Sequence, residues 1–205
     1  MRNDEDKLDE KLIDPDPISQ FQQWLDDAVT AQLPLPEAMS LATVNSSGQP
    51  CSRMVLLKKV DSEGFVFFTN YHSAKAKELD ANPAAALVFF WPQLERQVRV
   101  EGSVVKTSAE ESREYFATRP RESQIGAWAS PQSEVISSRE ELEKRQEELD
   151  EKYRGRVVDW PEHWGGYRLA PERIEFWKGR IGRLHDRIVY ERQADGSWST
   201  KRLAP

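Results

Sequence analysis

The chain of 205 residues has a single cysteine, Cys51, so no disulfide can form within it. Chains without disulfides are typical of reducing compartments, and the sequence therefore predicts a cytoplasmic location. No apolar run approaches the roughly 20 residues that a membrane-spanning helix needs. The N-terminal stretch MRNDEDKLDEKL also lacks the apolar segment of a signal peptide. These absences argue against a membrane protein and against a secreted one.

Basic charge and the common catalytic signatures are also scarce. The formal net charge is -6, which argues against nucleic-acid binding, because a duplex-binding surface needs a wide basic face. The sequence contains no GxGxxG, Walker or GxSxG pattern. Its three histidines, His72, His163 and His185, stand in no metal-ligand spacing, so we predict no metal site. The seven tryptophans are in excess, and such rings suit an interface or a ring-shaped cofactor as well as a core.

The sequence does contain a series of short β-type runs joined by tight turns. Links as short as NSSG (45–48) and DSEG (61–64) make antiparallel hairpins. The expected strands cover residues 39–44, 52–60, 65–70, 84–91, 97–106, 167–169, 174–177, 187–190 and 197–203. Capping residues predict helices that begin at Asp16, at Ser73, at Thr107 or Ser108, and near Ser138. We predict a flexible segment over 1–14 and one domain over 15–205, mainly β with peripheral helices, most simply an antiparallel barrel.

One candidate anion site lies at the helix that begins at Ser73. Lys75 lies in its first turn, so backbone N–H groups, a hydroxyl and an ammonium would meet there. An ordinary capped helix is the alternative. Arg53 and Lys58 lie on an expected strand, and their odd spacing sends them to opposite faces unless a bulge or strand end intervenes.

A second candidate site follows the helix capped by Ser108. Tyr115, Arg119 and Ser123 lie close together in sequence there, and Arg121 adds a second cation. An arginine pair with a tyrosine and a serine nearby suits a phosphate group. Alternatively, the cations only complement the C-terminal end of a helix.

The most basic segment is WKGRIGRLHDR, residues 177–187. If it is a strand, Arg183, His185 and Arg187 project from one face. Such a row of basic side chains suits a phosphorylated planar ligand, because a guanidinium group binds two phosphate oxygens at once and stacks on aromatic rings. A solvated basic edge strand is the alternative.

Several longer motifs occur in order along the chain: RMVLLK (53–58), TNYHSAKA (69–76), ERQVRVEG (95–102), YFATRPRESQIGAWAS (115–130), HWGGYR (163–168) and EFWKGRIGRLHDR (175–187). From about Asp16 to the C-terminal RLAP, the chain resembles the pyridoxamine 5′-phosphate oxidase family. The resemblance implies a split β-barrel homodimer with FMN between the subunits. It also implies oxidation of pyridoxamine or pyridoxine 5′-phosphate to pyridoxal 5′-phosphate, with O2 as the acceptor, in vitamin B6 salvage.

The resemblance also implies roles for individual residues. Contacts with FMN would come from Arg53, Met54, Val55, Leu56, Lys58, Phe68, Thr69, Ser73, Ala74, Lys75, Gln97, Gln132, Ser133, Trp177 and Arg187. The substrate phosphate would be held by Lys58, Tyr115, Arg119 and Ser123. Arg183 and His185 would be the catalytic pair and would cover the substrate ring.

Some positions depart from the family pattern. Ala74 stands where many members have arginine, and Gly182 stands where asparagine is frequent. No tyrosine follows Arg2, so the substrate-covering R-x-x-Y of the family is missing. Two other functions remain open: a flavin- or pyridoxal-phosphate-binding carrier or sensor, and another FMN enzyme on the same barrel.

Overall fold

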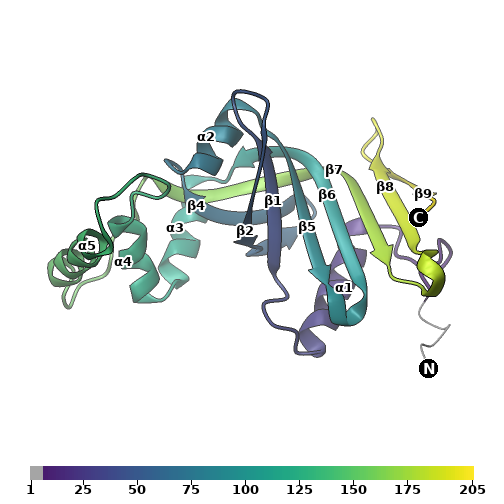
Figure 1. Ribbon diagram of the computed structural model, residues 1–205, viewed down its shortest axis with the longest axis horizontal. Coiled ribbons are helices and arrows are strands. Elements are labelled where there is room, and N and C mark those ends of the chain that lie inside the picture. The colour runs from purple at the N-terminus through teal and green to yellow at the C-terminus, as the bar shows by residue number, and fades with distance from the viewer. Residues whose placement is uncertain (1–6) are drawn as a thin grey trace.

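A nine-stranded antiparallel sheet forms the body of the computed structural model, which describes residues 7–205. Its strands are β1 (Ala38–Val44), β2 (Pro50–Leu56), β3 (Lys59–Asp61), β4 (Gly64–Asn70), β5 (Ala84–Trp91), β6 (Arg96–Lys106), β7 (Trp164–Lys178), β8 (Asp186–Arg192) and β9 (Trp198–Arg202). The order across the sheet is β2-β1-β5-β6-β7-β4-β3, and β8 joins β7 to β9. All pairings are antiparallel, as the short links predict. The sheet curls around α1, as Figure 1 shows.

The long strand β7 connects the two ends of the molecule. One edge pairs with β6 along its length, while the other edge pairs first with β4 and then with β8. The prediction of two separate strands here, 167–169 and 174–177, was wrong. Pro171 lies opposite Gly102 at a register shift, and such a bulge lets a proline sit within a sheet. Gly102 permits the close approach, because a Cβ atom there would lie 2.0 Å from the Ala170 carbonyl oxygen.

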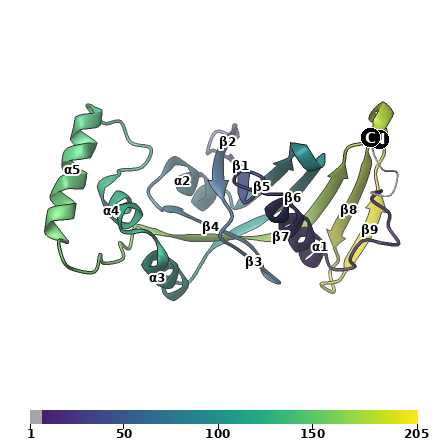
Figure 2. The same ribbon diagram turned by 90° about the horizontal axis from the view of Figure 1, so that it is seen from below.

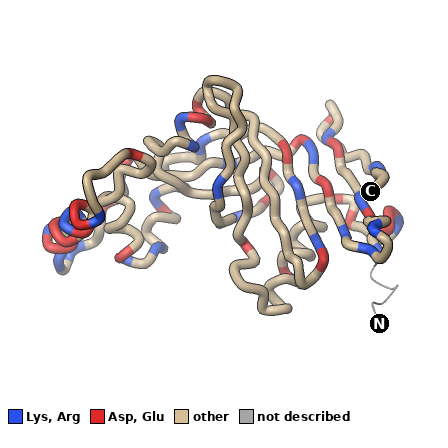
Figure 3. Tube along the Cα trace, viewed as in Figure 1, with Lys and Arg blue, Asp and Glu red and all other residues tan. Residues whose placement is uncertain are grey.

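Within residues 7–205, five α-helices accompany the sheet: α1 (Pro17–Thr30), α2 (Ala74–Ala81), α3 (Ala109–Thr118), α4 (Arg121–Ala129) and α5 (Arg139–Lys152). The four predicted N-caps are confirmed, since the side chains of Asp16, Ser73, Ser108 and Ser138 each accept a backbone N–H. The helix α4 was not predicted. In Figure 2, α3, α4 and α5 gather at one end of the molecule, and β8 and β9 lie at the other. Figure 3 shows acidic and basic residues mixed along α5, which buries none of its side chains.

The core lies between α1 and the concave side of the sheet. Phe21 of α1 is fully buried, and its ring centroid lies 4.9 Å from that of Phe65 and 4.8 Å from that of Phe89. Each such side chain contributes about 1.5–3 kcal/mol by burial. A second cluster under α3, α4 and α5 contains Phe116, Ile125, Tyr153, Val158 and Trp164. The predicted mainly β architecture with peripheral helices is confirmed.

The predicted flexible segment, 1–14, lies partly outside the described residues, which begin at residue 7. The segment that follows residue 7 contacts the C-terminal strand β9. Arg202 donates hydrogen bonds to the Leu8 carbonyl oxygen at 2.7 Å and to both carboxylate oxygens of Glu10, at 2.6 and 2.7 Å. The hydrogen bond from Arg202 lowers the pKa of Glu10 to about 2. No helix within residues 7–205 is long and apolar enough to cross a membrane.

Candidate functional site

The first cluster of predicted ligand residues lies where β4 ends and α2 begins. The Lys75 ammonium lies 3.1 Å from the Thr69 hydroxyl and 2.9 Å from the Gln132 side-chain oxygen. It also lies 3.5 Å from the hydroxyl of Ser73, which caps α2. These four predicted FMN contacts come from three segments of the chain, and the fold brings them to one point.

Arg53 of β2 belongs to the same cluster. Burial lowers the pKa of Lys75, and the nearby positive charge of Arg53 lowers it further. Arg53 donates to the Glu78 carboxylate at 2.7 Å and to the Thr43 hydroxyl. Two cations beside the N-terminus of α2 suit a phosphate group. The strand β2 ends at Leu56, so a strand end does separate Arg53 from the exposed Lys58.

A second cluster lies under α3, at the start of β7. The rings of Phe68 and Tyr115 stack with centroids 4.1 Å apart, and Phe68 also stacks on Trp164 at 5.3 Å. The Arg119 guanidinium lies 4.4 Å from the Trp164 ring centroid. Ser123 follows on the first turn of α4 and is half-buried. Trp164 was not among the predicted site residues, although it is part of the motif HWGGYR.

Arg119 is the chemically distinctive member of this cluster. Its Nη1 atom is buried and has no hydrogen-bond partner within residues 7–205. Burial lowers the pKa of the guanidinium. A buried cation without an anion is unfavourable for folding, so its natural complement is a bound anion. A phosphate fits, because guanidinium binds phosphate oxygens bidentately.

A third cluster lies at the far end of β7. Gln97 of β6, Trp177 of β7 and Arg187 of β8 are cross-strand neighbours. The His185 ring centroid lies 4.7 Å from that of Trp177. Arg187 holds the buried Glu175 carboxylate at 2.9 and 3.2 Å and donates to the Ala204 carbonyl oxygen at 2.9 Å.

The prediction that Arg183, His185 and Arg187 project from one strand face was wrong. The strand β8 begins only at Asp186. Arg183 lies in a 3-10 turn, Ile181–Arg183, where both Gly182 and Arg183 have positive φ angles, 72° and 63°. Alternation along a strand therefore does not apply to Arg183, which is exposed.

The second and third clusters lie at opposite ends of β7. Trp164 is its first residue and Trp177 its last but one. At roughly 3.3 Å per residue, they are separated by roughly 40 Å along the strand. Figure 1 shows α3 and α4 at one end of β7 and β8 at the other. Within one chain, Tyr115 and Arg119 therefore cannot share a small ligand with Arg183 and His185.

Comparison with known proteins identifies the family. A sequence model described as pyridoxamine 5′-phosphate oxidase matches residues 25–153. A second, described as the pyridoxine 5′-phosphate oxidase C-terminal dimerisation region, matches residues 164–205. The chain belongs to the pyridoxamine 5′-phosphate oxidase family.

Individual relatives agree with this family. The pyridoxine/pyridoxamine 5′-phosphate oxidase of Microcystis aeruginosa is 59% identical over 200 residues, covering 98% of this chain and 94% of its own. That of Cupriavidus necator is 57% identical over 198 residues, covering 97% and 93%. The predicted enzyme class and FMN cofactor are confirmed at the level of this family.

Solved structures confirm the split-barrel fold. PhzG from Burkholderia lata, in complex with tetrahydrophenazine-1-carboxylic acid, has a TM-score of 0.91 and 31% identity, and the match covers 98% of both chains. A pyridoxamine 5′-phosphate oxidase-related, FMN-binding protein from Nostoc punctiforme has a TM-score of 0.73 and 18% identity, covering 90% of this chain and 97% of its own.

Proposed function

We propose that this protein oxidises pyridoxamine or pyridoxine 5′-phosphate to pyridoxal 5′-phosphate with O2, forming H2O2, and ammonia from the amine, in vitamin B6 salvage. The observation that carries the proposal is the buried Nη1 atom of the half-buried Arg119 side chain, which has no hydrogen-bond partner within residues 7–205. This cation suits a phosphorylated substrate. The tetrahydrophenazine-1-carboxylic acid bound by PhzG has no phosphate, and PhzG is also less similar in sequence than the B6 oxidases.

We further propose that the working site lies between two subunits of a homodimer. The separation of the clusters along β7 supports this arrangement, because one chain cannot place both on the same substrate. The match of residues 164–205 to a dimerisation region also supports it. Tyr115 and Arg119 of one subunit would then face Arg183 of the partner subunit and His185 of the partner subunit, with FMN at the interface.

The proposed role of the protein is to bind and orient the reactants. Arg53, Ser73 and Lys75 would hold the FMN phosphate. Other FMN contacts would come from Met54, Val55, Leu56, Lys58, Phe68, Thr69, Ala74, Gln97, Gln132, Ser133, Trp177 and Arg187. When bound, FMN supplies the two-electron oxidation at the C4′ carbon of the substrate.

The substrate would be fixed at two places. Lys58, Tyr115, Arg119 and Ser123 would hold its phosphate, and Arg183 and His185 would cover its ring and stabilise charge as it shifts. Positioning of this kind contributes several kcal/mol, up to about 7–11 kcal/mol. No residue is required as a covalent catalyst.

Turnover in air tests the proposed reaction. The FMN-loaded protein should convert pyridoxamine 5′-phosphate to pyridoxal 5′-phosphate with an equal amount of H2O2. A protein that binds FMN and pyridoxal 5′-phosphate but forms no product would instead be a carrier or sensor. A protein that oxidises only unphosphorylated compounds would be a different split-barrel oxidase.

Lys75→Ala should weaken FMN binding more than substrate binding. The loss of a charge-assisted contact with the FMN phosphate costs about 1.5–3 kcal/mol, which corresponds to about a 10- to 150-fold rise in the FMN Kd. Lys77→Ala is the matched control, since Lys77 is an exposed lysine on the same helix. Fluorescence titration of both apoproteins with FMN gives the two constants. A large defect in substrate affinity at saturating FMN would show that Lys75 does not serve the flavin.

A further inference from the structure

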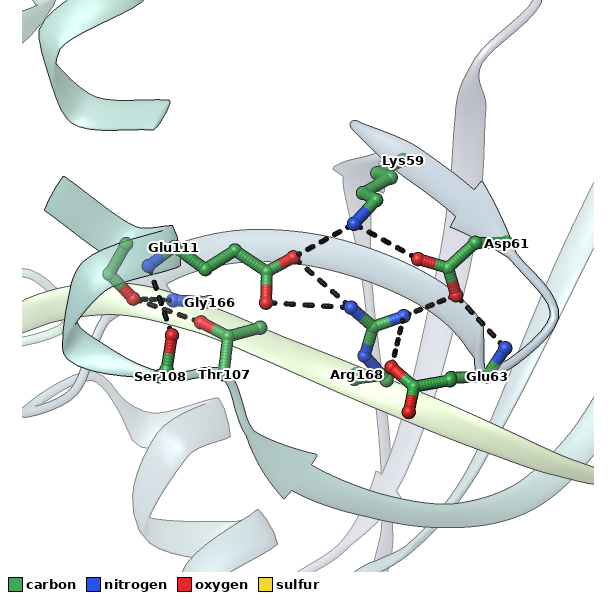
Figure 4. A network of polar contacts seen from close by, with 9 residues as sticks. Lys59, Asp61, Glu63, Thr107, Ser108, Glu111, Gly166 and Arg168 are labelled. Atoms are coloured by element: carbon green, nitrogen blue, oxygen red, sulfur yellow. Dashed lines mark hydrogen bonds and ion pairs between the residues drawn. The ribbon is translucent and has the colours of Figure 1, made fainter. Parts of the chain in front are cut away.

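An ion network around the buried Arg168 links β7, β3 and α3. Arg168 of β7 is 8% exposed, and its guanidinium lies 2.5 Å from the Asp61 carboxylate of β3. The same group donates to both oxygens of Glu111 on α3, at 3.1 and 3.4 Å. Lys59 closes the network from the other side, 3.0 Å from Asp61 and 3.6 Å from Glu111. Figure 4 shows Arg168 between the two carboxylates.

The start of α3 lies directly against β7 beside this network. The Thr107 N–H donates to the Gly166 carbonyl oxygen at 2.9 Å, and the Gly166 N–H donates to the Ser112 hydroxyl at 3.2 Å. A Cβ atom on Gly166 would lie 2.6 Å from the Thr107 hydroxyl, and one on Gly165 would lie 2.2 Å from the Tyr71 hydroxyl. Gly165 and Gly166 therefore let the start of α3 approach β7 closely. The ion pair between Arg168 and Glu111 then holds α3 beside this strand.

The network joins the two segments that carry the proposed phosphate ligands. Glu111 lies one turn before Tyr115 on the same side of α3, and Arg119 follows directly where the helix ends. Lys58 directly precedes β3, the strand that carries Asp61. Its N–H donates to the Val66 carbonyl oxygen at 2.8 Å, so the backbone at Lys58 is held to the sheet. Arg168 thus connects α3, which carries Tyr115, to β3, which follows Lys58.

We propose that Arg168, acting through Glu111 and Asp61, is a positioning residue that sets the geometry of the substrate-phosphate site. This inference rests on the proposed function of Lys58, Tyr115 and Arg119. A guanidinium can bridge two carboxylates because its donors lie in a fixed plane, whereas a lysine offers one point charge. Loosening α3 would shift Tyr115 and Arg119 relative to Lys58, and a misplacement of about 1 Å costs up to about 100-fold in rate.

The test compares two ligands that differ only by the phosphate. 4-Deoxypyridoxine 5′-phosphate and 4-deoxypyridoxine have no oxidisable group at C4′, so equilibrium binding to the FMN-loaded dimer can be measured without turnover. The variants are Glu111→Gln, Arg168→Lys and Arg168→Met. Glu110→Gln is the matched control, because it removes an exposed acid from the same first turn of α3.

Glu111→Gln and Arg168→Lys should raise the Kd of the phosphorylated ligand about 10- to 100-fold, as expected when a charge-assisted contact with the phosphate is weakened. The Kd values of the unphosphorylated ligand and of FMN should stay unchanged, and Glu110→Gln should bind as the wild type does. The double variant Glu111→Gln, Arg168→Met should bind no more weakly than Arg168→Met alone, because both changes break one contact.

Equal weakening of both ligands, or wild-type binding by Glu111→Gln, would overturn the proposal. A wild type that binds the two ligands equally would overturn it as well, since no phosphate site would exist to position. Failure of the proposed oxidation appears separately, as normal discrimination between the two ligands without any turnover of pyridoxamine 5′-phosphate.

Discussion

Replacing Arg119 with methionine should abolish the preference for phosphorylated substrate and leave the protein at least as stable as the wild type. The guanidinium lies over the Trp164 ring, and its buried Nη1 atom has no hydrogen-bond partner within residues 7–205. Its removal therefore relieves an uncompensated buried charge. Removing one partner of a buried charge pair at a binding site costs about 2–5 kcal/mol, which corresponds to roughly a 30- to 4,000-fold loss of affinity for the phosphorylated substrate.

The measurement is the ratio of kcat/KM for pyridoxamine 5′-phosphate to that for pyridoxamine, together with the melting temperature. Arg113→Met is the matched control, because Arg113 is an exposed arginine on the preceding helix, α3, and its guanidinium lies over the Trp160 ring. It should keep the wild-type ratio. If Arg119→Met keeps the ratio and melts well below the wild type, Arg119 is a structural residue and the phosphate site is assigned wrongly.

Arg183→Ala and Arg187→Ala should separate substrate binding from flavin binding. Arg183 is exposed in a turn, so its loss should change stability by less than about 0.5 kcal/mol. It should nevertheless lower kcat/KM by about 100-fold or more, as expected when an electrostatic contact with the reacting group is lost. Arg187→Ala should instead release FMN.

Arg187→Ala needs its own control, because Arg187 also forms an ion pair with the buried Glu175. Arg173 contacts the same carboxylate at 3.4 Å but is not a predicted FMN contact, so Arg173→Ala tests the loss of that support alone. Arg173→Ala and Arg187→Ala should both lower the melting temperature. Only Arg187→Ala should lose flavin, which is measured by absorbance after gel filtration. Wild-type behaviour in Arg183→Ala and Arg187→Ala would refute the site. Flavin loss in Arg183→Ala alone would show that the two roles are exchanged.

Local signals made much of this fold predictable. The capping side chains of Asp16, Ser73, Ser108 and Ser138 form hydrogen bonds within three residues of themselves, so the sequence alone carries them. Lys75 lies two residues after the cap Ser73, so its position in the first turn of α2 depends on the same short segment. These features need no long-range information.

Other features depend on partners far away in the chain. Pro171 predicts a break in β7, but Gly102 lies opposite and allows the bulge that keeps the strand continuous. Proline and glycine near residues 119–130 obscured α4, although Ile125 and Ala129 have helical spacing. The separation of the clusters along β7 follows from strand pairing, which no local pattern specifies.

In the proposed reaction, bound FMN accepts electrons from a phosphorylated B6 substrate held between two subunits. This reaction is tested most directly by mixing the FMN-loaded protein with pyridoxamine 5′-phosphate without oxygen and recording the visible flavin absorbance. The absorbance should bleach, one pyridoxal 5′-phosphate should form per FMN, and the colour should return with H2O2 when air is admitted. Equal amounts of pyridoxamine should bleach it far more slowly. Flavin absorbance that stays unchanged with pyridoxamine 5′-phosphate and with pyridoxine 5′-phosphate would contradict electron transfer from these substrates to FMN.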